Sequence, residues 1–387
     1  MKRFLSFCFA ALLGLIVMAQ SYDFSVPFME CGYLFFKYDY SESDAVKLTS
    51  CSIVLVDNDS CMADFAILPD IVTYNGHDYR VTSIGESAFS NVQVRNLIIG
   101  DFVEVIDSIA FKGNIYINHI TFGENVKRIY RRAFADCVKL KSITFNDNLT
   151  NIDSGLFSGC TSLTSLELPE SLIFTSTGMC DGCTALETVK LGSKVFCIEP
   201  YAFRNCSSLK SITLPPVLTE IAYNSFESCT CLESINIPEG VVRMTGGCFK
   251  NCISLFEITI PNSISSAFYQ EMFMECENLV IVTLGSRLEQ VQARTFFGYN
   301  SLRRIICRNP NVTEVKNLYN VTGSAFDNFD CSKCILEVPF GTSQAYIDAG
   351  WTGFKTVVET PSTFDVDQDG YVNISDVTKL IDYLLCR

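Results

Sequence analysis

Histidine is almost absent from this chain of 387 residues, which contains only His77 and His119. His77 lies in a predicted hairpin turn and His119 just before a predicted strand, and neither stands in a nucleophile or metal-ligand motif. Hydrolases built on a Ser–His or Cys–His pair, or on zinc, need imidazole as base or ligand. A carboxylate pair would allow glycoside hydrolysis without histidine, but carboxylates scattered over a repetitive surface provide no concave, desolvated site. We therefore predict that the protein is not an enzyme.

Basic residues are also scarce. The 29 Lys and Arg stand against 43 Asp and Glu, which gives a formal net charge of −14. Proteins bind nucleic acid largely by neutralising its phosphates with basic side chains, and no basic stripe occurs along the sequence. This balance argues against nucleic acid as a partner.

Long apolar runs are missing except at the start of the chain. Lys2 and Arg3 precede an apolar run over 4–18, and Ala19-Gln20-Ser21 is a plausible cleavage region. The run is shorter than the ~20 residues that a membrane-spanning helix needs. We therefore predict that residues 1–20 are a signal peptide, and that the mature chain is secreted or at the cell surface without a transmembrane segment.

What is abundant is a repeat of about 23 residues, marked by a cysteine that usually follows a phenylalanine by three positions. Its cysteines are Cys137, Cys160, Cys183, Cys206, Cys229, Cys252 and Cys276. The spacing is 23 five times and then 24, and Cys180 stands once in the phenylalanine position. A fixed period of this length indicates one supersecondary unit that is copied and stacked.

The unit is complete over 198–215, where it reads Ile-x-x-x-Ala-Phe-x-x-Cys-x-x-Leu-x-x-Ile-x-Leu-Pro. Its second half alternates like a short strand and ends at Pro215, which cannot donate to a ladder. Its first half has apolar residues four and five apart, which favours a helical or 3₁₀ turn. Each coil is therefore predicted to contain one strand and one turn, with a continuous core inside the stack.

This pattern resembles the BspA-like, or treponemal-type, leucine-rich repeats of bacterial surface proteins over residues 82–338. The resemblance implies a leucine-rich-repeat solenoid of short parallel strands, turns and 3₁₀ segments. It also implies an exported, non-catalytic adhesion protein that presents its surface to protein or glycan partners on a host or on bacteria.

Segments outside the repeats are expected to cover the ends of the stack, because an end coil exposes its core. Residues 21–81 read as a β-rich cap, with strands expected over 32–38, 52–56 and 70–74 and a hairpin turn at Asn75-Gly76. Residues 339–359 read as a C-terminal cap in which Trp351 and Phe354 cover the last coil, followed by a linker over 360–364.

The periodic cysteines are expected inside the core as buried thiols, although export and 19 cysteines would ordinarily predict a disulfide framework. A position repeated once per coil beside the core leucine points inward at every level. Outside this series, Cys331 and Cys334 stand close enough in the sequence to form a local pair, either as a disulfide or as two thiols. They are weak as a metal site, because neither a second pair nor a nearby histidine completes four ligands.

The last segment, 365–387, contains a calcium-loop pattern. Oxygen ligands recur at loop positions 1, 3, 5 and 12 with glycine at position 6, as in an EF-hand. The predicted Ca²⁺ ligands are Asp365, Asp367, Asp369, the Tyr371 carbonyl, Asn373 and Asp376. An amphipathic helix over 377–385 follows. Loop and helix together resemble one half of a type I dockerin, which implies a cohesin-like partner and, as an alternative function, membership of a polysaccharide-degrading, cellulosome-like assembly.

Outward positions of the strands change character along the chain. In the middle repeats they are small and polar, from Ser142 to Asn236. The following repeats instead place apolar residues and one arginine there: Phe256, Val280, Ile281, Arg304 and Ile306. Such a patch indicates either a partner-binding surface or residues buried under the C-terminal cap.

Overall fold

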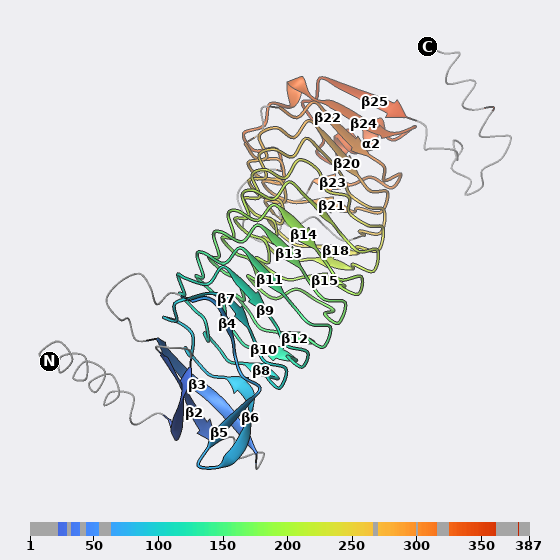
Figure 1. Ribbon diagram of the computed structural model, residues 1–387. Coiled ribbons are helices and arrows are strands. Elements are labelled where there is room, and N and C mark those ends of the chain that lie inside the picture. The colour runs from blue at the N-terminus through green and yellow to red at the C-terminus, as the bar shows by residue number, and fades with distance from the viewer. Residues whose placement is uncertain are drawn as a thin grey trace, which may run out of the picture. The chain divides into compact units, whose positions relative to one another are not determined.

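The structure, a computed structural model, describes residues 22–28, 32–38, 44–53, 63–265, 270–298, 301–315, 325–360 and 378. The chain divides into two compact units, 1–194 and 195–387. Each is built of stacked coils whose short strands pair in parallel with those of neighbouring coils (Figure 1). The predicted fold class, a solenoid of short parallel strands and turns, is confirmed.

The N-terminal unit begins with strands that do not follow the repeat. Antiparallel strands β1 (Phe24–Phe28), β2 (Gly32–Tyr38) and β3 (Ala45–Ile53) are followed by β4 (Ala63–Ile67) and by the hairpin of β5 (Ile71–Tyr74) and β6 (His77–Ile84). The hairpin turn is confirmed: Asn75 and Gly76 have φ of 52° and 79°, both positive as a type I′ turn requires. Pairing with both β2 and β6 begins β3 at Ala45, earlier than the strand expected over 52–56. Ser52 and Ile53 lie in β3, and residues 54–56 lie outside the described residues.

The coils of the N-terminal unit contribute strands to three sheets. These strands are β7 (Val94–Ile98), β8 (Val105–Ile106), β9 (His119–Thr121), β10 (Arg128–Ile129), β11 (Ser142–Thr144), β12 (Asn151–Ile152), β13 (Ser165–Glu167) and β14 (Thr188–Lys190). β8, β10 and β12 continue in parallel from β6, whereas β4, β7, β9 and β11 form a second sheet. The third sheet contains β13 and β14.

Within the described residues, the C-terminal unit contains the following strands and short helices. They are β15 (Cys197–Ile198), β16 (Ser211–Thr213), β17 (Glu220–Ile221), β18 (Arg243–Met244), β19 (Glu257–Thr259), β20 (Ile281–Leu284), β21 (Gln290–Val291), β22 (Arg304–Cys307), β23 (Glu314–Val315), η2 (Cys331–Lys333), β24 (Ile335–Pro339), α2 (Ser343–Asp348) and β25 (Thr356–Thr360). β19, β20, β22, β24 and β25 form one parallel sheet.

The prediction of one strand per coil was wrong. The first isoleucine of the unit ends a second, two-residue strand, as where Ile198 of β15 pairs with Ile221 of β17. The turn that follows is not helical, because Tyr201 and Asn205 both have φ of 59°. A right-handed helix cannot contain residues in this left-handed region. The spacing of four and five thus reflects a strand end followed by a tight turn.

Stacked phenylalanine rings form the centre of each unit. Ring centroids lie 4.8, 4.9 and 5.7 Å apart along Phe89, Phe111, Phe134 and Phe157. In the C-terminal unit, Phe203, Phe226, Phe249, Phe273 and Phe296 continue the pattern at 5.5, 5.6, 6.3 and 6.2 Å. All nine side chains are fully buried. The repeat period therefore places one ring above the next within each unit.

The periodic cysteines lie in the core, as predicted. Six of the seven thiols donate to the carbonyl of the phenylalanine from the preceding coil, for example Cys160 Sγ to Phe134 O at 3.0 Å and Cys229 Sγ to Phe203 O at 3.2 Å. Burial raises the pKa of the Cys229 thiol well above its usual range. These cysteines therefore act as small apolar side chains with a weak donor, rather than as nucleophiles.

Trp351, the only tryptophan, closes the C-terminal unit. It is fully buried, donates from Nε1 to Thr313 O at 2.7 Å, and meets Phe326 edge-to-face at 5.3 Å. Phe354 also contacts Phe326, at a ring distance of 5.5 Å. The Tyr346 hydroxyl on α2 donates to Asn309 O at 2.7 Å. Trp351 and Phe354 thus lie against Phe326, in the position that covering the last coil requires.

Candidate functional site

The five residues predicted to contact a partner lie together on neighbouring coils of the C-terminal unit. Ile281 of β20 pairs with Arg304 of β22, and Thr283 pairs with Ile306. Val280 precedes β20, and its N–H donates to the carbonyl of Phe256, which precedes β19, at 2.8 Å. Strand alternation places Ile281, Arg304 and Ile306 on the face opposite the buried Val282 and Ile305. Phe256 and Val280 flank this face, each just before its strand.

This surface exposes apolar groups to solvent. Phe256 is 54% exposed, Arg304 is exposed, and Val280, Ile281 and Ile306 are half-buried. Burial under the C-terminal cap, the second reading of the sequence, is therefore not what the structure shows for Phe256 and Arg304. We call the outward side chains of β19, β20, β22 and β24, with Phe256 and Val280, the C-terminal sheet face.

Two residues of the C-terminal sheet face were not predicted, Ile335 and Glu337 on β24. They pair with Arg304 and Ile306, respectively. Arg304 forms an ion pair with Glu337 and donates to one oxygen of its carboxylate through both Nε and Nη2. The Glu337 side chain is only 9% exposed. A desolvated carboxylate needs such a partner, so this pair fixes the orientation of the one arginine predicted to bind.

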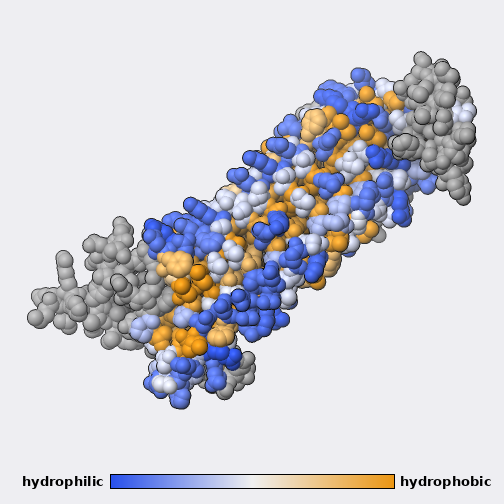
Figure 2. All heavy atoms as spheres, turned by 45° about the vertical axis from the view of Figure 1, so that its right-hand side comes forward, coloured by the Kyte–Doolittle hydropathy of each residue, from blue (hydrophilic) through white to orange (hydrophobic). Residues whose placement is uncertain are grey.

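Exposed apolar residues also occur elsewhere on the molecule. Figure 2 shows orange, apolar atoms reaching the surface among blue and white ones along the body of the molecule. Scattered apolar exposure is normal for proteins. In the C-terminal sheet face the apolar residues are contiguous, because they lie on or beside adjacent strands of one sheet.

The middle repeats show the polar surface that the sequence predicted. Outward positions from Thr144 to Lys190 in the N-terminal unit are exposed, and so are those from Ser211 to Asn236 in the C-terminal unit. His119 lies on this surface and forms hydrogen bonds with Ser142 Oγ at 2.7 Å and Thr121 Oγ1 at 3.1 Å. Its imidazole is thus engaged by neighbouring hydroxyl groups of the sheet.

The cysteine pair Cys331 and Cys334 lies at η2 as two thiols. Burial raises the pKa of Cys331 to about 11 and that of Cys334 to about 12. Both are therefore protonated at neutral pH, whereas metal binding and nucleophilic attack need the thiolate. Within the described ranges, no group of three or more His, Cys, Asp or Glu residues could hold a metal ion.

Four predictions fall on residues that the structure does not describe. They are the signal peptide over 1–20, the linker over 360–364 apart from Thr360, the calcium ligands from Asp365 to Asp376, and the helix over 377–385 apart from Thr378. Among the described residues, no helix has the length and apolarity to cross a membrane.

Comparison with known proteins agrees with this geometry. Residues 82–210 and 197–328 match the BspA type leucine rich repeat region, in six copies. A leucine-rich repeat protein from Bacteroides ovatus is similar in structure, with a TM-score of 0.65, 23% identity, and coverage of 82% of this chain and 83% of that one. At this identity the likeness shows the fold alone.

Two further solved structures are more distant. A leucine rich cell surface protein from Faecalibacterium prausnitzii has a TM-score of 0.42 and 22% identity over 76% of this chain and 97% of its own. The T. pallidum leucine rich repeat protein has a TM-score of 0.43 and 24% identity over 57% of this chain and 87% of its own. No curated protein matches the chain.

Proposed function

The chain belongs to the BspA-type leucine-rich repeat family, and from this premise we propose that it is a non-catalytic binding protein whose C-terminal sheet face contacts a partner protein. The observation that carries the proposal is the contiguous apolar surface around Phe256 and Ile281, beside the paired Arg304. Aromatic residues and arginine are enriched at the centres of protein interfaces. Stacked repeats offer extended surfaces for such contacts.

The proposal is tested with the mature protein on an array of host-matrix and bacterial-surface proteins and glycans. Phe256→Ser and Ile281→Ser should each weaken binding to the captured protein, by about tenfold for a residue at the interface centre. Val242→Ser is the matched control, since Val242 is 52% exposed in the same unit but lies outside the C-terminal sheet face. Equal binding by all three variants would refute the assignment of this face.

Export and surface location are part of the same proposal. They are supported by the apolar run behind Lys2 and Arg3 and by family membership. The expected result is a secreted or surface-bound chain that begins near Ser21, measured by fractionation and mass spectrometry of the N-terminal peptide. A full-length chain retained inside the cell would contradict it.

For the C-terminal segment we propose Ca²⁺ binding by the loop from Asp365 to Asp376, as its ligand spacing supports. Calorimetric titration of the full chain should show Ca²⁺ binding that is lost in the Asp365→Ala, Asp376→Ala double variant.

This motif also favours the second candidate function, recruitment to a polysaccharide-degrading assembly. That function requires Ca²⁺-dependent capture by a cohesin domain, and absence of capture by the Ca²⁺-loaded chain would eliminate it.

A further inference from the structure

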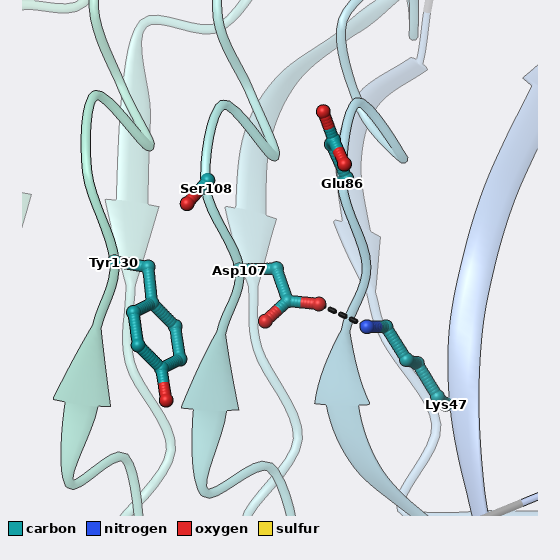
Figure 3. A pocket seen from close by; sticks show the side chains of 5 residues that line it. All are labelled: Lys47, Glu86, Asp107, Ser108 and Tyr130. Atoms are coloured by element: carbon teal, nitrogen blue, oxygen red, sulfur yellow. Dashed lines mark hydrogen bonds and ion pairs between the residues drawn. The ribbon is translucent and has the colours of Figure 1, made fainter.

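A polar hollow opens at the surface of the N-terminal unit. It has a volume of about 330 Å³. Its lining residues are Lys47, Glu86, Asp107, Ser108 and Tyr130, all drawn in Figure 3. The volume lies within the range of small-molecule sites.

The hollow forms where the non-repeating strands meet the first coils. Lys47 lies on β3, which pairs in parallel with β6, and β6, β8 and β10 follow in register through Ile84, Ile106 and Ile129. The residues just after these isoleucines therefore lie side by side and supply the rest of the lining. Lys47 comes from outside the repeats, so a regular coil cannot reproduce this arrangement.

Charges around the hollow are balanced. Lys47 forms an ion pair with Asp107, shown by the dashed line in Figure 3. Arg128 lies 5.8 Å from the centroid of the Tyr130 ring and donates to its hydroxyl at 3.3 Å. The lining itself has one cation, Lys47, and two anions, Asp107 and Glu86. Arg128, which contacts Tyr130 from outside the lining, supplies the second cation. A neutral ligand therefore suits the hollow better than an ion.

Two side chains of the lining remain available for a ligand. Within the part of the chain that the structure describes, Glu86 and Ser108 form no side-chain hydrogen bond and no ion pair, and Glu86 is exposed. The carboxylate accepts, the hydroxyl donates and accepts, and the ammonium of Lys47 donates. This mixture matches ligand hydroxyl groups, which need both donors and acceptors.

The tyrosine ring adds an apolar surface to these polar groups. Tyr130 is half-buried in the wall of the hollow. Arg128 already makes the cation–π contact with this ring, so a ligand cation would compete with a residue of the chain itself. The C–H groups of a sugar ring carry no charge, so Arg128 does not repel them.

We propose that this hollow binds a neutral saccharide unit, with Tyr130 contacting the sugar ring and Glu86 and Ser108 bonding to its hydroxyl groups. This inference rests on the proposed binding function and adds a ligand class for a second site. The hollow and the C-terminal sheet face lie in different units, so variants of one leave the other intact.

The test is saturation-transfer NMR on the full chain with the methyl glycosides of glucose, galactose, mannose, fucose and N-acetylglucosamine. At least one glycoside should bind, and Tyr130→Ala should lower the affinity for that glycoside about tenfold, because the contact with the ring is lost. Glu86→Gln and Ser108→Leu, which respectively remove the charge and fill the hollow, should weaken it as well. Tyr223→Ala is the matched control, because Tyr223 is an exposed tyrosine of the other unit.

Three results would overturn the saccharide assignment. The first is no binding of any glycoside; the second is binding unchanged by both Tyr130→Ala and Ser108→Leu. The third is Glu86-dependent binding of putrescine in place of a glycoside, which would identify a cation site. Circular dichroism of each variant shows that its fold is kept. Loss of glycoside binding with intact protein capture by the C-terminal sheet face would separate this inference from the proposed function.

Discussion

The stacked phenylalanine rings give a quantitative test of the solenoid core. Phe226 is fully buried between Phe203, at 5.5 Å and an interplanar angle of 17°, and Phe249, at 5.6 Å and 6°. Phe226→Ala should lower the free energy of unfolding by about 3–5 kcal/mol, because it removes the ring and leaves a cavity. Phe226→Leu keeps most of the apolar volume. It should cost about 1–3 kcal/mol, from two ring contacts of about 0.5–1.5 kcal/mol each.

The measurement is guanidinium unfolding at equilibrium, followed by circular dichroism and by tryptophan fluorescence. Trp351 is the only tryptophan and lies buried in the same unit as Phe226, so its fluorescence reports on that unit alone. The control is Phe256→Ala, which removes the same ring from a site that is 54% exposed. It should change the free energy by about 0.5 kcal/mol or less.

The comparison also separates stability from binding. Phe226→Ala should destabilise the fold and, under native conditions, keep the C-terminal sheet face, whereas Phe256→Ala should weaken partner capture and keep the stability. A cost below about 1 kcal/mol for Phe226→Ala, or an equal cost for both variants, would contradict this expectation. Either result would mean that the aligned rings do not define the core.

Further predictions concern single contacts. Ellman's reagent should label Cys231, which is exposed, in the native protein, and should label Cys229 only after unfolding, because Cys229 is buried and protonated. Arg304→Ala should cost about 1–3 kcal/mol in denaturant unfolding, because it leaves the Glu337 carboxylate desolvated, and adding Glu337→Gln should recover most of the loss. Asn114→Ala should cost about 2–4 kcal/mol by the same assay, whereas Asn114→Cys should cost less, because Asn114 Nδ2 donates to a phenylalanine carbonyl as the periodic cysteines do.

The 23-residue period was enough to predict the core, because it reports which side chain returns to the same place in every coil. The buried rings and thiols follow from it directly. The period also predicts the surroundings of residues that replace the cysteine. Asn114 stands near the cysteine position of an early coil, and its Nδ2 donates to Phe89 O at 2.6 Å. Substitution at that position is tolerated because asparagine satisfies the same carbonyl.

Local backbone geometry was harder to predict than the core. Apolar spacings of four and five suit a helix in isolation, yet here Ile198 belongs to a strand. The deciding contact is the pairing of Ile198 with Ile221, 23 residues away. A pattern search inside one repeat cannot detect a hydrogen-bond partner that lies in the next repeat.

Contacts between distant parts of the chain also explain which site residues the sequence did not reveal. Alternation within a strand was sufficient to place Ile281 and Arg304 on an outward face. The position of Phe256 between the core residues Leu255 and Ile258 of the repeat placed it outside the core. Glu337 was missed because its role is to form an ion pair with Arg304. The two residues are 33 positions apart, and the 23-residue period does not relate them. Lys47 was missed because its partner Asp107 is 60 residues away and only the fold brings them together. Repetition therefore specifies the inside of this protein, and the residues that distinguish its surface lie where repetition ends.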